Sequence, residues 1–414
     1  MIFAVVEMLT SRAKWAKVGI LIQERWLVSL HGLRKLADGR RSVAREEGVV
    51  EAGTEYAVRS DHEQWDYTSQ VSMPEALLEG EGTRFRQDQK LPDGRLQATY
   101  QYQSAIYHEA SFCSNGVTHV SVFDRHDRRV PEFSYAKYGK VVPVSRHLDI
   151  DRYVPGTTLS LYGNVENTAG NIGHWMIDGL ARLFLALRHH DLTSIDHVLV
   201  PKLKYGFQRE SLLELGIPSH KIVEIDVLEC VRCERLIVTT APRGFSSSNT
   251  PGWLIDGFRQ ALLPAKGAVA AGKRIYISRR DAGSRKFVNE EEIIACLEKF
   301  GFEPVEMSSY DFNDKIALFA QAEMIVGLTG AGLTNLMLCR SDACVLELFP
   351  ASYVTYFYTS IACYLGMDYQ YLVFDNDSVL SSMNRYYGNL SLDTDMLADR
   401  ISSIVDHQKS LKTG

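Results

Sequence analysis

The sequence has no surplus of basic residues. Its 414 residues contain 45 Lys and Arg against 51 Asp and Glu, which gives a formal net charge of −6. Proteins that bind a nucleic-acid backbone carry extra cationic side chains that neutralise its phosphates, so the composition argues against DNA or RNA as a partner. The 45% of hydrophobic and 23% of charged residues exclude a disordered or fibrous chain. At roughly 100–200 residues per domain, the length suits two domains.

Long hydrophobic runs are also lacking. No stretch of about 18 uninterrupted apolar residues occurs, so no helix is expected to span a membrane. The N-terminal residues MIFAVVEMLTSR contain Glu7 within their apolar stretch, and they have neither a preceding basic region nor a small-residue cleavage site. They therefore do not have the pattern of a signal peptide.

Residues 12–41 differ from the rest of the chain in charge. Nine of the Lys and Arg residues and only three acids fall within residues 1–45, where apolar residues including Trp15 and Trp26 recur at helical spacing. A basic amphipathic helix of this kind can contact an anionic membrane peripherally, or it can dock its apolar stripe on a neighbouring domain. Both interpretations stay open, and we expect a cytoplasmic protein with or without membrane association.

Cysteine is scarce, and its pattern indicates no disulfide framework. The seven cysteines are an odd number scattered through apolar segments, which favours a reducing compartment. Cys230 and Cys233 form a CxxC pair, but no second Cys or His pair stands where it would complete the four ligands of a structural zinc. We therefore expect two small apolar thiols near a strand.

Paired acids do not indicate a metal site either. None of the Asp-x-Asp spacings is accompanied by a second set of ligands, and they lie at residues 149/151, 375/377 and 393/395. The last pair falls at a predicted helix N-terminus, where an acid caps free N–H groups. We expect no metal ion and no bound cofactor.

The chain divides into two regions with different patterns. Short Val- and Ile-rich strands recur between residues 98 and 240, with an apolar helix predicted over 174–190. Residues 241–272 are rich in Pro, Gly and Ser and are the best candidate for an interdomain connection. From 274 to 408 strands and helices alternate regularly, which predicts βαβ units on a parallel sheet. We predict an α/β fold that comprises a basic helical segment at 1–45, domains at 46–245 and 246–385, and a C-terminal helix in 386–414.

A glycine-rich turn joins a predicted strand at 324–329 to a predicted helix. Gly330 and Gly332 allow a ligand to approach the backbone closely, and the helix start offers unpaired N–H groups to an anion. The turn matches neither GxGxxG nor the P-loop pattern and lacks a phosphate-binding Lys, so close backbone packing is the alternative.

Three arginines follow the predicted strand at 274–278. Ligands bind beyond the C-terminal ends of parallel strands, and the planar guanidinium groups of Arg279, Arg280 and Arg285 suit phosphate. A solvated basic loop is the alternative. Together with the glycine-rich turn of the same sheet, the arginines predict a site that neutralises a diphosphate without a metal.

A further helix opens at the Gly- and Asn-rich turn before His174. His174 and Asp178 are four residues apart on one helical face, so they can act as a base and its orienting carboxylate. Arg182 extends that face by another turn. A structural histidine is the alternative, but the exposed helix start favours a functional role.

Three separated motifs resemble glycosyltransferase family 61. They are GNIGHWMIDGLARL at 170–183, YISRRDAGSRKFVNEEE at 276–292, and AEMIVGLTGAGLTNLMLC at 322–339, followed by VLELFP at 345–350. The resemblance runs from about residue 100 to 385, and the family includes bacterial surface-polysaccharide, plant xylan-decorating and animal O-linked N-acetylglucosamine transferases. It implies a GT-B architecture, with two Rossmann-like domains facing across a cleft. It also implies an inverting, metal-independent transfer from a nucleotide sugar, such as a UDP-sugar, to a glycan or lipid-linked glycan.

The resemblance also implies roles for individual residues. His174 and Asp178 would be catalytic and would stand on the acceptor side with Asn171, Trp175 and Arg182. Glu347 would approach the nucleoside ribose. The remaining donor-binding residues would be Arg279, Arg280, Arg285, Thr329, Gly330, Ala331, Gly332, Thr334 and Asn335.

One residue departs from the family pattern. The family usually has His directly before Gly-Ala-Gly, whereas this chain has Thr329, whose hydroxyl can hydrogen-bond a phosphate oxygen but carries no positive charge. Arg279 or Arg280 could compensate, the donor could differ, or the protein could be a weakened member. Two other functions therefore stay open at this point. They are a nucleotide-sugar epimerase on the same scaffold and a catalytically weakened nucleotide-sugar-binding protein.

Overall fold

The computed structural model describes most of the chain from residue 55 onward. The described residues are 55–58, 62–73, 96–114, 119–136, 149–163, 170–226, 229–242, 250–263, 272–351, 353–354, 357–375 and 389–413. They belong to one compact unit. The basic segment predicted at 1–45 and its membrane contact through 12–41 lie outside this range. Within the described part of the chain, no helix has the length and apolar character needed to cross a membrane.

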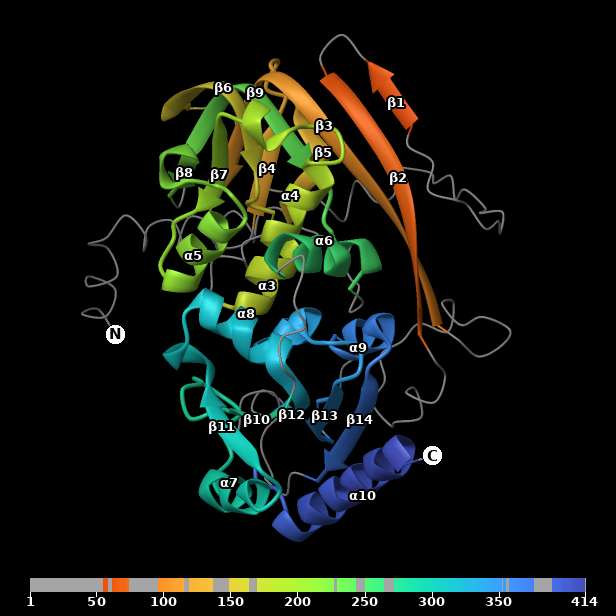
Figure 1. Cartoon of the computed structure of the whole chain (residues 1–414). Helices are drawn as coiled ribbons and strands as arrows, with labels where there is room; N and C mark the ends of the chain where they lie inside the picture. The colour runs from red at the N-terminus through yellow and green to blue at the C-terminus, as the bar shows by residue number, and fades with distance from the viewer. Residues whose placement is uncertain are drawn as a thin grey trace, which may run out of the picture. The chain divides into compact units, whose positions relative to one another are not determined.

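The N-terminal half is built on a mixed sheet, here called the N-terminal sheet. It has nine strands in the order β1-β2-β3-β9-β6-β7-β8, with the β4–β5 hairpin attached to β3. Strands β9, β6, β7 and β8 pair in parallel, whereas β1, β2 and β3 extend the sheet in antiparallel fashion (Figure 1). The bounds are Glu55–Val58, His62–Met73, Leu96–Ser114, His119–Phe123, Arg129–Ala136, Arg152–Ser160, His197–Pro201, Ile222–Ile225 and Cys230–Thr239 for β1 to β9.

The C-terminal half contains a wholly parallel sheet, here called the C-terminal sheet. Its five strands have the order β11-β10-β12-β13-β14, which confirms the predicted βαβ units. The strand order reverses between β10 and β12, and ligands of open α/β sheets bind beyond the strand ends at such a switch point. The bounds are Lys273–Ser278, Phe302–Glu306, Ala322–Leu328, Cys344–Pro350 and Asp368–Phe374 for β10 to β14.

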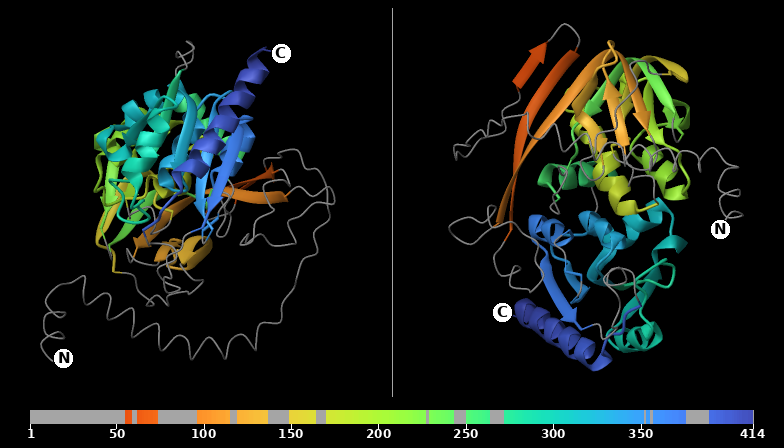
Figure 2. Two further views of the ribbon diagram at one scale, coloured as in Figure 1. Left: turned by 90° about the horizontal axis from the view of Figure 1, so that it is seen from below. Right: turned by 180° about the vertical axis from the view of Figure 1, so that it is seen from behind.

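Helices cover both faces of the C-terminal sheet because side chains alternate along its buried strands. Tyr276 packs with α7 and α10 on one face, whereas Ile275 and Ile277 belong to the core on the opposite face. Figure 2 shows α10 running along the outside of this sheet. The helices here are α7 at Glu290–Glu298, α8 at Phe312–Gln321, the 3₁₀ helix η9 at Ala331–Leu338, α9 at Thr359–Leu365 and α10 at Thr394–Thr413.

One continuous hydrophobic core joins the two halves. It contains buried side chains of both sheets and of the helices η5, α4, α5, α6, α8, η9 and α9. Phe258 of α6 packs edge-on against Phe184 of α4 with ring centroids 4.8 Å apart, so α6 contacts the N-terminal half although it follows residue 246. The remaining helices are α3 at Ile172–His174, η5 at Trp175–Leu180, α4 at Ala181–Ala186, η6 at Leu192–Ser194, α5 at Gly206–Glu214, η7 at Ser219–Lys221, α6 at Gly252–Leu262 and η8 at Met307–Ser309.

Acidic side chains cap two helices, and the cap predicted for the 393/395 pair is one of them. The Asp311 side chain accepts from the Asp314 N–H at 2.7 Å, and Asp393 accepts from Asp395 N–H at 2.8 Å. Asn289 is different, because its side chain makes no capping hydrogen bond to α7. Its amide instead donates to the carbonyl of Leu392 at 2.8 Å and so ties α7 to the segment before α10.

The cysteine prediction is wrong for Cys230. Cys113 on β3 and Cys230 on β9 face each other across the antiparallel pair and form a disulfide. They are 117 residues apart in sequence, so only the pairing of β3 with β9 reveals that they meet. Cys233 is a buried free thiol, as expected. In the described residues no group of His, Cys, Asp or Glu side chains has the arrangement of a metal site.

Phe258 lies in the core that both halves share, so its replacement should lower the stability of the protein. Replacing this fully buried ring by Ala removes its contact with Phe184, and we expect a loss of about 3–5 kcal/mol in the free energy of unfolding. Val288 is 68% exposed, so Val288→Ala should change that free energy by less than about 0.5 kcal/mol. Urea titration followed by circular dichroism measures the free energy of unfolding of both variants. Equal losses in the two variants would contradict a core that depends on α6.

Candidate active site

A pocket lies where the two halves meet at the switch point of the C-terminal sheet. One wall comes from the start of α3 and η5, a second from the turn between β12 and η9, and a third from segments that contain aromatic residues. The lining residues are Asn171, Gly173, His174, Ile177, Arg285, Thr329, Gly330, Ala331, Thr334, Tyr353, Phe357 and Tyr358. Seven of these had been predicted as site residues from the sequence: Asn171, His174, Arg285, Thr329, Gly330, Ala331 and Thr334.

Two glycines allow the pocket walls to approach each other. A Cβ atom at Gly173 would lie 2.8 Å from Oγ1 of Thr334, so the start of α3 can contact η9 only without a side chain there. A Cβ atom at Gly330 would come within 2.6 Å of Nη1 of Arg279. The glycine-rich turn therefore packs closely against its neighbours, which is one of the two interpretations that the sequence left open; binding of an anion at the turn stays a prediction.

Of the three predicted arginines, Arg285 lines the pocket and Arg279 lies beside Gly330 of the pocket wall. Arg279 is held by the loop itself, since its Nε donates to the Arg285 carbonyl at 3.0 Å and its Nη2 to the Ser284 carbonyl at 2.8 Å. Arg285 has a left-handed backbone conformation, φ +54°, and its guanidinium stacks on the ring of Tyr353 at 4.8 Å. Its buried Nη1 has no hydrogen-bond partner among the described residues.

The electrostatics of these arginines favour an anion. Burial lowers the pKa of Arg279, and the positive charge of Arg285 lowers it further. Like charges held together and partly desolvated are unfavourable unless a negative ligand compensates them. The loop thus holds two cationic groups beside the N-terminal end of η9. Arg279 donates to carbonyl groups, which carry no full charge, and Arg285 lies over the Tyr353 ring.

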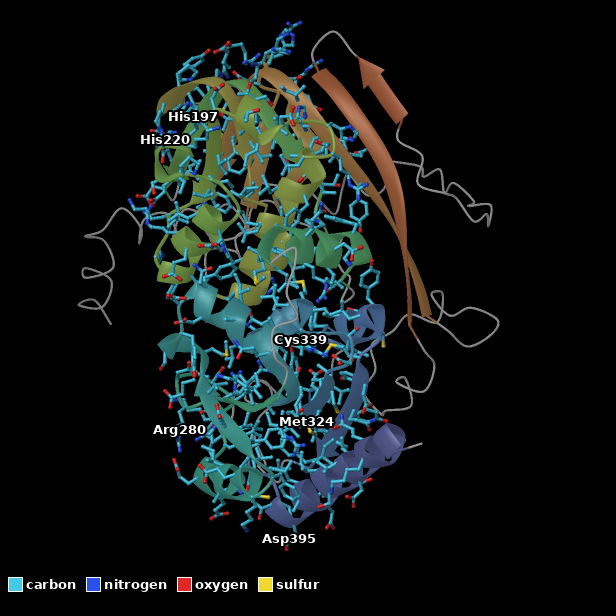
Figure 3. The ribbon with its side chains drawn as sticks, viewed as in Figure 1. His197, His220, Arg280, Met324, Cys339 and Asp395 are labelled. Carbon is cyan, nitrogen blue, oxygen red and sulfur yellow. A yellow bond between two sulfur atoms is a disulfide. The ribbon has the colours of Figure 1, made fainter. Side chains whose placement is uncertain are left out.

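Arg280 points elsewhere. Its guanidinium forms ion pairs with Glu291 of α7 and with Glu306 of β11, the second at 4.0 Å. Figure 3 shows Arg280 at the β11 edge of the C-terminal sheet. Successive side chains at a strand end alternate in direction, which separates Arg280 from Arg279. Arg280 does not line the pocket and matches the alternative of a solvated basic residue.

Glu290 positions the arginine loop and was not recognised as a site residue from the sequence. It is 6% exposed, and its Oε1 accepts from the Tyr276 hydroxyl at 3.1 Å, the Ser278 hydroxyl at 3.0 Å and the Arg279 N–H at 2.8 Å. An acid in the first turn of α7 is expected for helix electrostatics alone. Only the packing of α7 against β10 shows that this carboxylate anchors the strand end that carries Arg279.

His174 and Asp178 form the predicted pair. His174 Nδ1 lies 2.6 Å from Asp178 Oδ2, and the Asn171 side chain caps the helix start by accepting from the N–H groups of Gly173 and His174 at 2.9 and 3.2 Å. The helix continues as a π-helix over Trp175–Leu180, a geometry that is frequent at functional sites. His174 lines the pocket, and the largely buried Asp178 lies behind it.

Trp175 and Arg182 lie behind the same helix and do not reach the pocket. Trp175 is fully buried and donates its indole N–H to the Ser211 hydroxyl at 2.9 Å. Arg182 donates from Nε to the Asp178 carbonyl at 2.9 Å and from Nη1 to Thr239, while burial lowers its pKa to about 10. Both residues support the His174–Asp178 helix from within the core rather than contact a ligand.

Three further predicted donor residues do not line the pocket, and two of them, Asn335 and Glu347, are fully buried. Asn335 donates to the Gly332 carbonyl at 2.9 Å, and Gly332 packs against Ile277, so both shape η9 without lining the pocket. Glu347 has no exposed surface and accepts from the Tyr369 hydroxyl at 2.8 Å. It lies behind Thr329, which separates it from the pocket, and burial raises the pKa of Glu347 to about 8.

The aromatic wall was missed from the sequence. Tyr353, Phe357 and Tyr358 line the pocket, whereas the residues TYFYTSIACYLG at 355–366 predict a helix from the sequence. The helix α9 starts only at Thr359, which leaves Phe357 and Tyr358 in the preceding turn. Aromatic residues in a predicted helix give no signal that distinguishes a ligand wall from a core contact.

Comparisons with known proteins identify a family for the middle of the chain. Residues 172–346 match the family model described as Glycosyltransferase 61, which confirms the resemblance over that segment. Two beta-1,2-xylosyltransferases of Oryza sativa subsp. japonica are 26% identical, over 206 residues (44% of this chain and 42% of the relative) and over 219 residues (48% and 37%). A protein O-linked-mannose beta-1,4-N-acetylglucosaminyltransferase 2 of Bos taurus is 33% identical over 99 residues (22% and 17%). The chain thus spans less than half the length of these relatives.

The half-buried guanidinium groups of Arg279 and Arg285 predict that a diphosphate binds this pocket. Inorganic pyrophosphate should raise the Tm of the protein, because a ligand that binds only the folded state stabilises it. Arg279→Ala and Arg285→Ala should abolish that shift, whereas Arg280→Ala should retain it. Differential scanning fluorimetry measures the three variants side by side. An equal loss in Arg280→Ala would contradict the pocket as the binding place.

Proposed function

We propose that this chain, whose residues 172–346 belong to glycosyltransferase family 61, transfers a sugar from a nucleoside-diphosphate donor to a hydroxyl group of a glycan. The observation that carries the proposal is the arrangement of one pocket. A histidine paired with a carboxylate lines one wall, and the half-buried Arg285 lines another, with Arg279 beside Gly330. Such a transfer needs a base for the acceptor hydroxyl and a site that binds the diphosphate of the donor.

In this proposal the donor diphosphate binds between Arg279, Arg285 and the start of η9. The unpaired Nη1 of Arg285 and the Nη1 of Arg279 beside Gly330 donate to its oxygens. The first N–H groups of η9 lack intrahelical partners and add further donors. We propose a UDP-sugar as the donor, with the two guanidinium groups supplying the charge that a metal ion supplies in other enzymes.

The acceptor hydroxyl loses its proton to His174. Asp178 accepts the Nδ1–H of the ring, which leaves Nε2 as the basic nitrogen and stabilises the imidazolium after proton transfer. The acceptor oxygen then forms a bond to the anomeric carbon while the bond from that carbon to the donor phosphate oxygen breaks. The leaving diphosphate takes the electron pair. A single displacement of this kind inverts the anomeric configuration.

The arginines stabilise the charge that develops in the transition state. The leaving oxygen gains negative charge as its bond to the sugar breaks, and fixed donors in a partly desolvated site stabilise such charge more strongly than water does. Glu290 contributes indirectly, since it fixes the backbone at Arg279. Because these groups are already in place before the reaction, they need no reorganisation during it.

The relatives support the class of sugar and acceptor. Their names describe transfer of xylosyl and N-acetylglucosaminyl groups, which favours a pentosyl or hexosyl group for this chain. We propose a glycan or lipid-linked glycan as the acceptor. A thermal-shift screen against nucleoside diphosphates and their sugars, followed by transfer assays with the best donor, identifies the substrates.

The role of His174 can be separated from donor binding. His174→Ala should lower kcat by about 10²–10⁴-fold, because a positioned general base is lost, while the Kd for UDP stays unchanged. Asp178→Asn should lower kcat as well, because the ring loses its orienting carboxylate. Transfer assays and calorimetric titration with UDP measure the two quantities separately.

His220 provides a matched control for this prediction. It belongs to η7, and Figure 3 shows it with His197 in the N-terminal half, away from the C-terminal sheet. His220→Ala should therefore leave kcat unchanged. Full activity of His174→Ala would remove this residue from the mechanism, and absence of UDP binding to the unaltered protein would overturn the proposed donor.

A further inference from the structure

The guanidinium group of Arg285 has an aromatic ring as its partner instead of an acid. Its central carbon, Cζ, lies over the ring of Tyr353, 4.8 Å from the ring centroid. In the described part of the chain this guanidinium forms no ion pair, and its buried Nη1 has no hydrogen-bond partner. Arg280 of the same loop, which does not line the pocket, is instead paired with Glu291 and Glu306. The arginine that lines the pocket is thus the one that no carboxylate neutralises.

The ring and the guanidinium come from segments on either side of the glycine-rich turn. Arg285 belongs to the loop after β10. Tyr353 follows β13, and its backbone N–H donates to the Pro350 carbonyl at 2.8 Å. Strand β12 lies between β10 and β13 in the C-terminal sheet, and both residues line the pocket. Their contact therefore joins the loops next to the turn after β12, where the diphosphate is proposed to bind.

A ring as partner leaves the guanidinium able to bind an anion. A carboxylate would neutralise the positive charge and accept from the N–H groups, as it does in a bidentate ion pair. The negative face of an aromatic ring attracts the cation without supplying an oxygen acceptor, and the attraction is stronger where water is partly excluded. Arg285 and Tyr353 are both half-buried. The contact can therefore fix the position of the charge while its N–H donors stay available to a ligand.

The backbone of Arg285 extends the effect to Arg279. Arg285 has a left-handed conformation with φ +54°, which is unfavourable for a residue with a bulky side chain. In this conformation its carbonyl accepts from Nε of Arg279 at 3.0 Å while its side chain lies over Tyr353. A strained residue persists only where its surroundings hold it. The ring therefore helps to position both arginines of the loop.

We propose that Tyr353 is a positioning residue for donor binding. Its ring holds the Arg285 guanidinium by cation–π attraction, and Nη1 of Arg285 donates to a phosphate oxygen of the donor. The inference rests on the proposed function, because it takes a nucleoside diphosphate as the ligand. Tyr353 acts here through the charge distribution of its ring and not through its hydroxyl group, which makes the role separable by substitution.

Calorimetric titration with UDP compares variants that keep or remove the ring. Tyr353→Leu removes the ring and should raise the Kd for UDP about five- to thirtyfold, as expected for a partly desolvated cation–π contact. Tyr353→Phe keeps the ring, so its Kd should stay within about twofold of that of the unaltered protein. An unchanged Kd in Tyr353→Leu would overturn the inference. Equal losses in the two variants would do so as well, because the hydroxyl group would then account for the effect.

Tyr371 provides a matched control for the loss of a tyrosine ring. It lies on β14, is 39% exposed and does not line the pocket. Tyr371→Leu should therefore leave the Kd for UDP unchanged. A loss as large as that in Tyr353→Leu would contradict a specific role of the ring beside Arg285.

Fluorinated rings separate electrostatic attraction from shape. Phenylalanine with one, two or three ring fluorines can be incorporated in place of Tyr353. Each fluorine withdraws negative charge from the ring face and weakens its attraction for a cation, whereas the size of the ring changes little. The Kd for UDP should therefore rise with each added fluorine. A Kd that is independent of the number of fluorines would overturn the inference, even if Tyr353→Leu binds UDP poorly because it folds poorly.

The free energy of unfolding tests the contact without a ligand. If the ring stabilises the guanidinium, the losses caused by Tyr353→Leu and Arg285→Ala should be less than additive in the double variant. Urea titration measures the three variants, and additive losses would overturn the inference. Absence of UDP binding to the unaltered protein, together with non-additive losses in stability, would instead be a failure of the proposed function.

Discussion

The pocket depends on the close approach of α3 to η9. Gly173 at the start of α3 meets Thr334 of η9 at a distance that leaves no space for a Cβ atom. This contact brings the wall that contains His174 against the turn that contains Thr329 and Gly330. The hydrophobic core common to both halves maintains the approach, since α4, α6, α8 and α9 all contribute to it. The base on α3 and the anion site at the turn before η9 belong to different halves of the protein. They share one pocket only because α3 and η9 lie this close together.

The charges around the pocket follow a consistent order. A cationic group with an Nη1 unpartnered among the described residues, Arg285, lies at its surface, where a ligand can compensate it, and Arg279 lies beside Gly330 of the wall. Acidic groups lie behind the surface and act on the groups in front of them, as Asp178 does on His174 and Glu290 on the arginine loop.

Sequence reasoning succeeded where a local pattern dictates the geometry. The spacing of His174 and Asp178 places them one helical turn apart, and the alternation of strands and helices after residue 274 specifies a parallel sheet. Sequence reasoning was incomplete where the direction in which a side chain points had to be known. Arg279 and Arg280 are adjacent and chemically equal, yet one turns to the pocket and the other to Glu291. Trp175 and Arg182 belong to the same helix as His174, but they face the core.

The sequence by itself determined the elements and the residue types that carry the chemistry. Hydrophobic periodicity defines strands and helices, and strand ends followed by Gly or Arg indicate where a parallel sheet offers a ligand site. Only the tertiary structure decided which of those residues share the pocket. The disulfide between Cys113 and Cys230, the anchoring role of Glu290 and the aromatic wall of Tyr353 and Phe357 all arise from contacts between distant segments. Local periodicity contains no information about which faces of distant elements meet, because packing of the whole core selects them.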